Sequence, residues 1–253
     1  DVAQSHYELA YLYQLQRDFD AAREHYEREF DIRQRLFPVE EYPNGHPELA
    51  ECLNNLGYLL SLHGDYAGSR EYFERLLEMV QRLYPVDEYP NGHVDLAVSL
   101  DNLGNVLEEQ GESAEALVLV ELALAMRQRL FTLDEFPQGH PDLAISLNNV
   151  AAVLSSLGDY AGAREHYTQA LEMRRRLYPA DEWPRGHPDL ARSLNNLGVL
   201  LCSSNNHDEA RGYLQLALEM RQRLYTPEQY PQGHPDLASS LYNLGALLRF
   251  LGE

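Results

Sequence analysis

Residues 186–201 read GHPDLARSLNNLGVLL, and variants of this stretch return at a fixed distance along the chain. Each Gly-His pair stands 47 residues after the previous one. A constant period of this kind is typical of a solenoid, in which each unit packs only on its neighbours. The pairs occupy residues 45–46, 92–93, 139–140, 186–187 and 233–234.

Each copy predicts two helices. The first opens at Gly-His-Pro, because proline suits the first turn of a helix and the following acid favours its positive end. Leu190, Leu194 and Leu197 then recur at helical spacing. This first helix is expected to stop near Gly64, Gly111, Gly158, Asn205 and Gly252, residue types that suit a left-handed helix end.

The second helix of each pair follows after a short turn. It carries alanines where two helices would approach closely, such as Ala163 and Ala170. The first unit lacks the Gly-His-Pro start, and the last unit has only a first helix, about Pro235–Leu251. Second helices are expected over about Phe19–Phe37, Tyr66–Tyr84, Ser113–Phe131, Tyr160–Tyr178 and His207–Tyr225.

These patterns predict an all-α solenoid of about eleven helices over residues 1–253. We expect a single array rather than separate globular domains. Its units are about 1–44, 45–91, 92–138, 139–185 and 186–232, followed by a terminal helix over 233–253.

Composition limits the classes of function and the location that the chain can have. The 253 residues carry a formal net charge of −20, which argues against a nucleic-acid-binding surface. The charge favours a basic partner, or it serves only solubility. No apolar run approaches the ~20 residues of a membrane-spanning helix. Cys52 and Cys202 lie three repeats apart, roughly 30 Å if each unit advances about 10 Å, so they cannot form a disulfide. We expect a reducing, cytoplasmic location.

The helix pairs resemble the tetratricopeptide repeat (TPR) family. The resemblance rests on Leu56-Gly57 in a first helix, on the Gly64-Asp65-Tyr66 turn and on the alanines of second helices. The run HPDLARSLNNLG at residues 187–198, together with second helices that end in Met-Arg-x-Arg-Leu-Tyr, resembles the long TPRs of kinesin light chains. It also resembles those of their bacterial relatives, which are often fused to caspase-like (CHAT) proteases or signalling NTPases. This resemblance implies a right-handed solenoid of antiparallel helix pairs whose first helices line a concave, peptide-binding face.

The resemblance also implies a candidate site on that face. Asparagine is a mediocre helix former, yet it recurs in the middle of every first helix from residue 45 onward. An amide can donate to and accept from the backbone of an extended peptide, or it can orient the stack, and both readings stay open. The candidate ligand-binding residues are Asn54, Asn55, Tyr58, Asn102, Asn105, Asn148, Asn149, Arg192, Asn195, Asn196 and Asn243, with Val199 as a further specificity position.

Metal binding and catalysis are not expected. Equivalent histidines of a solenoid lie roughly 10 Å apart, whereas Zn–N bonds measure about 2.0–2.1 Å. No phosphate-binding glycine loop or strained nucleophile turn occurs, so we predict neither an enzyme nor a cofactor. The acidic loop pairs Glu40-Glu41, Asp87-Glu88, Asp134-Glu135 and Asp181-Glu182 are expected to form a solvated negative edge.

We therefore predict a scaffold that binds a protein or an extended, basic peptide, but neither nucleic acid nor membrane. One alternative is a regulatory or sensor arm of a larger bacterial enzyme, which a protease or NTPase domain beyond residue 253 would favour. The other is a structural array that associates end to end through its open termini.

Overall fold

The computed structural model describes residues 2–253, which fold into eleven α-helices and no strand. Residue 1, where the first predicted unit begins, lies outside the described residues. The number and order of the helices confirm the prediction of an all-α fold whose last unit contains only a first helix. In chain order the helices are α1 (Val2–Leu15), α2 (Phe19–Leu36), α3 (Pro47–His63), α4 (Tyr66–Leu83), α5 (Val94–Glu109), α6 (Ser113–Leu130), α7 (Pro141–Ser156), α8 (Tyr160–Leu177), α9 (Pro188–Ser203), α10 (His207–Leu224) and α11 (Pro235–Leu251).

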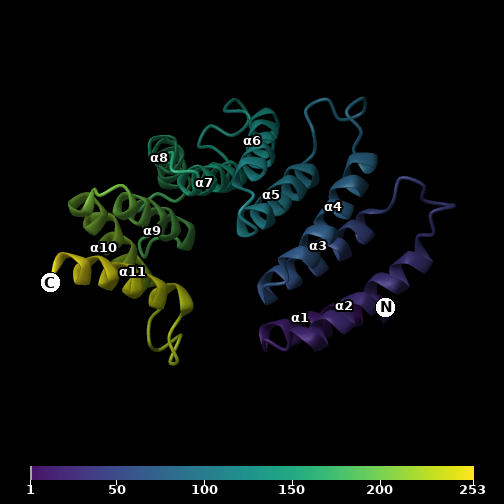
Figure 1. The fold of residues 1–253 in the computed structure, drawn as a ribbon, viewed down its shortest axis with the longest axis horizontal. Coiled ribbons are helices and arrows are strands. Elements are labelled where there is room, and N and C mark those ends of the chain that lie inside the picture. The colour runs from purple at the N-terminus through teal and green to yellow at the C-terminus, as the bar shows by residue number, and fades with distance from the viewer. Residues whose placement is uncertain (1) are drawn as a thin grey trace. The chain divides into compact units, whose positions relative to one another are not determined.

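The chain divides into two compact units, residues 1–130 and residues 131–253. In the first, α1 packs on α2, α3 on α4 and α5 on α6, and the pairs are joined by α2–α3 and α4–α5 contacts. In the second, α7 packs on α8 and α9 on α10. Contacts between α8 and α9 join these two pairs, and α11 packs on α10 (Figure 1). The fold is an α-solenoid of helix pairs, whereas the single array and its repeat boundaries stay predictions. We call the odd-numbered helices A helices and the even-numbered ones B helices.

The histidine of each Gly-His pair caps an A helix. His187 has an extended backbone, and its Nδ1 accepts a hydrogen bond from the N–H of Asp189 at 3.2 Å. The other four copies make the same bond at the same distance, 3.2 Å. A ring nitrogen that accepts carries no proton, so the cap requires a neutral imidazole. The histidines therefore have a structural role at the start of the A helices.

Aromatic stacking fixes the loop between each B helix and the next A helix. The ring of His187 lies flat on Tyr178, the C-cap residue of α8, with 3.6 Å between ring centroids. Trp183, in the middle of this loop, stands edge-on to both rings. The same three-ring arrangement recurs at the other four copies. The loop aromatics thus contact the two ends of their own loop and set where each A helix begins.

The glycine before each histidine has a positive φ, and four of the five also lie against a methionine of the following B helix. Gly186 has φ +89°, a region that L side chains rarely adopt. A Cβ on Gly186 would lie 2.5 Å from Cγ of Met220, on the following B helix. Gly233 has φ +85°, but apart from Gly233 and its two chain neighbours no heavy atom of the described residues lies within 4 Å of its ideal Cβ position. The motif therefore serves both the loop and the contact with the next helix pair.

The core lies between A and B helices. Alanines allow the close approach that the sequence predicted: Ala163, Ala170, Ala210 and Ala217 are all buried in the second unit. The A helices also end as expected, because Gly64, Gly111, Gly158 and Gly252, together with Asn205, all have positive φ.

Candidate functional site

All the predicted ligand-binding residues lie on A helices, and they differ in exposure. Tyr58, with 52% of its surface exposed, and Val199 are accessible to solvent, as are Asn105 and Arg192. The asparagines lie deeper: Asn148 and Asn195 are buried, and Asn54, Asn55, Asn102, Asn149, Asn196 and Asn243 are half-buried. The amides therefore lie below a rim of exposed side chains that differ from repeat to repeat.

Some of the amides bind one another across neighbouring A helices. In the first unit Asn102 Nδ2, on α5, donates to Asn54 Oδ1, on α3, at 2.7 Å. In the second unit Asn243, on α11, donates to Asn195, on α9, at 3.0 Å. Both pairs join residues 48 positions apart, one repeat plus one residue. The donor stands at the position equivalent to Asn196 in its A helix, and the acceptor at the position equivalent to Asn195 in the preceding A helix.

Other amide atoms lack such a partner among the described residues. Asn148 donates to the backbone carbonyl of Ala144 in its own helix at 2.6 Å, while its buried Oδ1 accepts no hydrogen bond from residues 2–253. The buried Nδ2 of Asn55 donates none within the same range. A buried polar group without a partner costs free energy, so a hydrogen bond to either atom would be stabilising. The asparagine row therefore combines bonds within the stack with unused hydrogen-bonding groups.

Four B helices carry a buried arginine at the same repeat position, and we call these residues the arginine row; the sequence prediction missed them. Arg174, near the end of α8, is only 1% exposed. Its Nη1 donates to the backbone carbonyl of Asp189 at 3.2 Å and to Oγ of Ser193 at 2.5 Å, both on α9. Arg221, on α10, donates to Asp236 and Ser240 of α11 at 2.8 and 2.7 Å. Arg174 and Arg221 thus each join a B helix to the start of the next A helix by hydrogen bonds.

In the first unit the arginines of this row have acidic partners. Arg33, on α2, pairs with the buried Glu29 at 2.9 Å and approaches Glu48 of α3 at 3.2 Å. Arg127, on α6, forms a buried ion pair with Asp101 of α5.

Burial lowers the pKa of Arg174, in the second unit, to about 10, so that guanidinium stays charged at neutral pH. The signal was present in the sequence, because all four arginines share the 47-residue register.

Two sequence models described as Tetratricopeptide repeat match the chain. One matches residues 1–82, and the other matches residues 96–142, 143–189 and 190–236. The chain belongs to the tetratricopeptide repeat family. The successive starts at 96, 143 and 190 are again 47 residues apart, so the long period is built into the TPR units themselves. A comparison with curated proteins finds no match.

Several solved structures share this fold. A putative kinesin light chain from Podosopora anserina, with nearly identical TPR-like repeats, is 18% identical over 87% of this chain and 95% of its own, with a TM-score of 0.65. BtubC (BKLC) from P. vanneervenii is 25% identical over 92% and 84%, with a TM-score of 0.67. A Rap protein complexed with Competence and Sporulation Factor is 16% identical over 96% and 63%, with a TM-score of 0.62. The family models and the likeness to kinesin-light-chain-like repeats confirm the resemblance to the TPR family.

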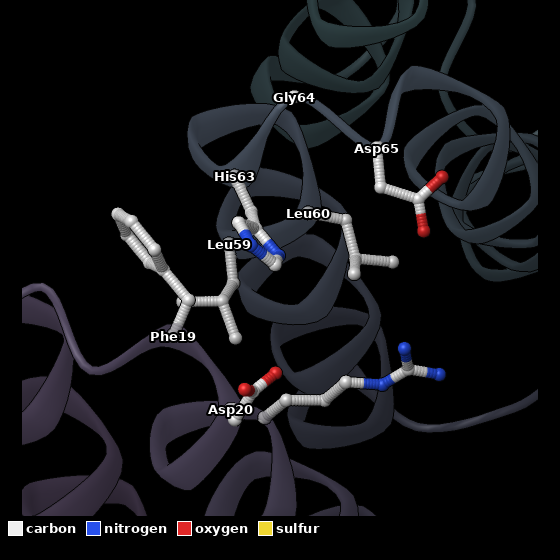
Figure 2. A pocket seen from close by; sticks show the side chains of 8 residues that line it. Phe19, Asp20, Leu59, Leu60, His63, Gly64 and Asp65 are labelled. Carbon is white, nitrogen blue, oxygen red and sulfur yellow. The ribbon is translucent and has the colours of Figure 1, made fainter.

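One hollow of this TPR fold, of about 320 Å³, lies between the start of α2 and the end of α3. Figure 2 shows the ring of Phe19 beside that of His63, and their centroids lie 5.2 Å apart. Asp20 and Asp65 also line the hollow, while Arg23, another lining residue, is bound to Glu27 at 2.7 Å. None of the predicted ligand-binding residues, all of which the structure describes, lines it, so this hollow is separate from the asparagine row.

Within residues 2–253, no three His, Cys, Asp or Glu side chains gather as a metal ion would require. The same part of the chain has no helix with the length and apolar content needed to cross a bilayer. The acidic pairs of the first four loops are exposed to solvent.

Proposed function

We propose that this TPR array is a scaffold that binds a protein or an extended peptide along the exposed side of its A helices. The observation that carries the proposal is the asparagine row, in which equivalent amides stand in successive A helices beneath exposed, variable side chains. Membership of the TPR family supports the same function. The Rap protein complexed with Competence and Sporulation Factor is one instance of a ligand held by a structure of this fold.

The amide chemistry suits a peptide backbone. Each asparagine offers an acceptor and donors, so it can pair with a backbone N–H or C=O whatever the peptide sequence. An extended chain rises about 3.3 Å per residue, and packed helices stand about 10 Å apart, so each repeat would meet about three peptide residues. A row with the period of the repeat therefore matches an extended ligand.

The exposed residues would supply specificity. Tyr58 and Val199 offer apolar surface, Asn105 a second amide, and Arg192 a cation that is paired with Asp189 at 2.7 Å. Because these side chains differ between repeats, each repeat would select a different ligand residue. The net charge of −20 favours a basic ligand over an acidic one.

Site-directed cross-linking tests the proposal. A photoreactive residue at Tyr58 or Val199, on A helices, should cross-link a partner from an extract of the native organism. The same group at Leu216 or Gln222, exposed positions of the B helix α10, is the matched control. Equal cross-linking from both sets of positions, or none from Tyr58 and Val199, would contradict binding along the A helices.

A further inference from the structure

The row of buried arginines has one gap. Arginine occupies the same position in four B helices, at residues 33, 127, 174 and 221, each a multiple of 47 residues from the next. The B helix α4 has Val80 there, and the Val80 side chain is buried. An aliphatic side chain cannot donate to the polar groups that arginine engages in the other repeats.

The acceptors for the missing arginine are nevertheless present. Arg174 and Arg221 use two groups on the next A helix: the carbonyl of the residue 15 positions ahead and the serine 19 positions ahead. For residue 80 these positions are Asp95 and Ser99, on α5. Ser99 is 1% exposed, and its hydroxyl donates to the carbonyl of Asp95 at 2.7 Å. The α4–α5 contact therefore keeps the serine and carbonyl without the guanidinium.

A hollow of about 320 Å³ opens at this place. Its wall contains Val80, Asp95 and Ser99, the three positions that make the arginine contact elsewhere, and it extends to Glu51 and Asn54 on α3. It lies within the first unit, between two neighbouring A helices and over the B helix that joins them. An open hollow thus lies where the other repeats bury their own arginine.

The charges around the hollow favour a cation. The carboxylates of Glu51 and Asp95 are exposed, and none of the described residues that line the hollow is basic. The Glu51 carboxylate already attracts one guanidinium, since it lies 3.7 Å from Nη1 of Arg33. Leu76, Val80 and Val98 add apolar wall that can contact an aliphatic stem.

We propose that this hollow binds an arginine side chain of the protein or peptide that the array holds, in the place of the missing arginine. The inference rests on the proposed function and names the chemistry of one ligand residue. The planar guanidinium presents several donors at fixed angles, so it can engage the Ser99 hydroxyl and a carboxylate together. A lysine ammonium has no such fork, and a neutral ligand lacks the charge that Glu51 and Asp95 attract.

Small probes test the hollow without a known partner. N-acetyl-arginine methylamide should shift the backbone amide signals of residues 50–54 and 95–99 in a ¹H–¹⁵N NMR titration. The citrulline analogue has the same shape without the charge, and it should bind about tenfold more weakly or not at all. Equal shifts with both analogues, or no shifts with the arginine analogue, would overturn the proposal.

Val80→Arg tests the proposed arginine site most directly, because the new side chain would occupy the hollow from within the array. It should weaken the arginine probe about tenfold or more. If Val80→Arg does not fold, Ser99→Ala and Glu51→Gln should each weaken the probe several-fold, with Glu78→Gln, an exposed acid on the same B helix α4, as the unchanged control. Unchanged probe affinity in these variants would overturn the assignment to this hollow. Cross-linking at Tyr58 and Val199 reports separately on the proposed function, so the two failures are distinguishable.

Discussion

Asn102 donates its side-chain amide hydrogen to Asn54 across two successive A helices, with 2.7 Å between Nδ2 and Oδ1. The two residues are 48 positions apart, so the bond ties one repeat to the next. Asn243 and Asn195 repeat the relationship in the second unit at 3.0 Å. The bond orients neighbouring A helices, and it also holds the amides in a row at which a peptide backbone could bind.

Removing this pair should destabilise the first unit. Asn102→Ala and Asn54→Ala should each lower the free energy of unfolding by about 0.5–1.5 kcal/mol, the usual net value of one hydrogen bond. The double variant should cost less than the sum of the two, because both remove the same bond. Urea denaturation at neutral pH measures all three free energies. Strict additivity would show that the two side chains do not interact in solution.

The histidine cap should contribute to the stability of α9. His187→Ala removes both the acceptor for the Asp189 N–H and the ring stacked on Tyr178, so we expect a loss of about 1–2 kcal/mol. His187→Asn keeps a capping oxygen without the ring, and its loss should be smaller. Hydrogen exchange in the first turn of α9 reports the change locally. Equal losses in both variants would assign the whole effect to stacking.

Because the His187 cap requires a neutral imidazole, it predicts that the free energy of unfolding depends on pH. Burial lowers the pKa of His187 below its ordinary value of 6.5, so the unfolded chain binds a proton more readily than the folded one. The stability from neutral His187 is complete above about pH 6.5 and is lost as the pH falls below that value. Burial raises the pKa of Glu29 to about 6, so the folded chain binds this proton more readily than the unfolded one. The contribution of Glu29 to the free energy of unfolding therefore rises as the pH falls from about 6 to 4.5, opposite to that of His187.

The wild type must therefore be compared with His187→Asn across pH 5–8, since Glu29 titrates alike in both. The free-energy difference between the two proteins should shrink as the pH falls from 7 to 5. A difference that stays constant over this range would contradict the role of neutral His187 as a cap.

Two glycines at the same motif position separate backbone strain from packing. Gly186 and Gly233 both have positive φ, so Gly→Ala at either should cost about 1–3 kcal/mol in strain. Only at Gly186 would the new methyl group meet Met220, which should add about 1 kcal/mol or more. Thermal denaturation of the two variants gives the comparison. A larger loss for Gly233→Ala would contradict this assignment of the methionine contact.

The fold could be predicted from sequence because each of its devices is local and repeated. The Gly-His-Pro start, the left-handed glycine ends and the leucine spacing need no knowledge of distant residues. The site was harder to predict. The asparagines could be placed on A helices, but the bond from Asn102 to Asn54 depends on how two helices are offset, which periodicity does not reveal.

The arginine row shows the same limit. Basic residues near the end of a helix are common there because they favour its negative end, and that interpretation concealed the burial of Arg174. Its acceptors, Asp189 and Ser193, lie on the next helix pair. Only the structure brings these residues together, and only then does Val80 stand out as an exception in the register.

The central claim, that the array holds its ligand through the asparagine row, is tested most directly by one affinity measurement. The partner captured by cross-linking is titrated calorimetrically against the wild type, against Asn102→Ala/Asn149→Ala/Asn196→Ala, and against Gln81→Ala/Gln128→Ala/Gln222→Ala, which removes exposed amides from B helices. We predict about a tenfold or greater loss of affinity for the asparagine variant alone, roughly 1.4 kcal/mol or more. An asparagine variant that stays folded and binds with wild-type affinity would contradict the account.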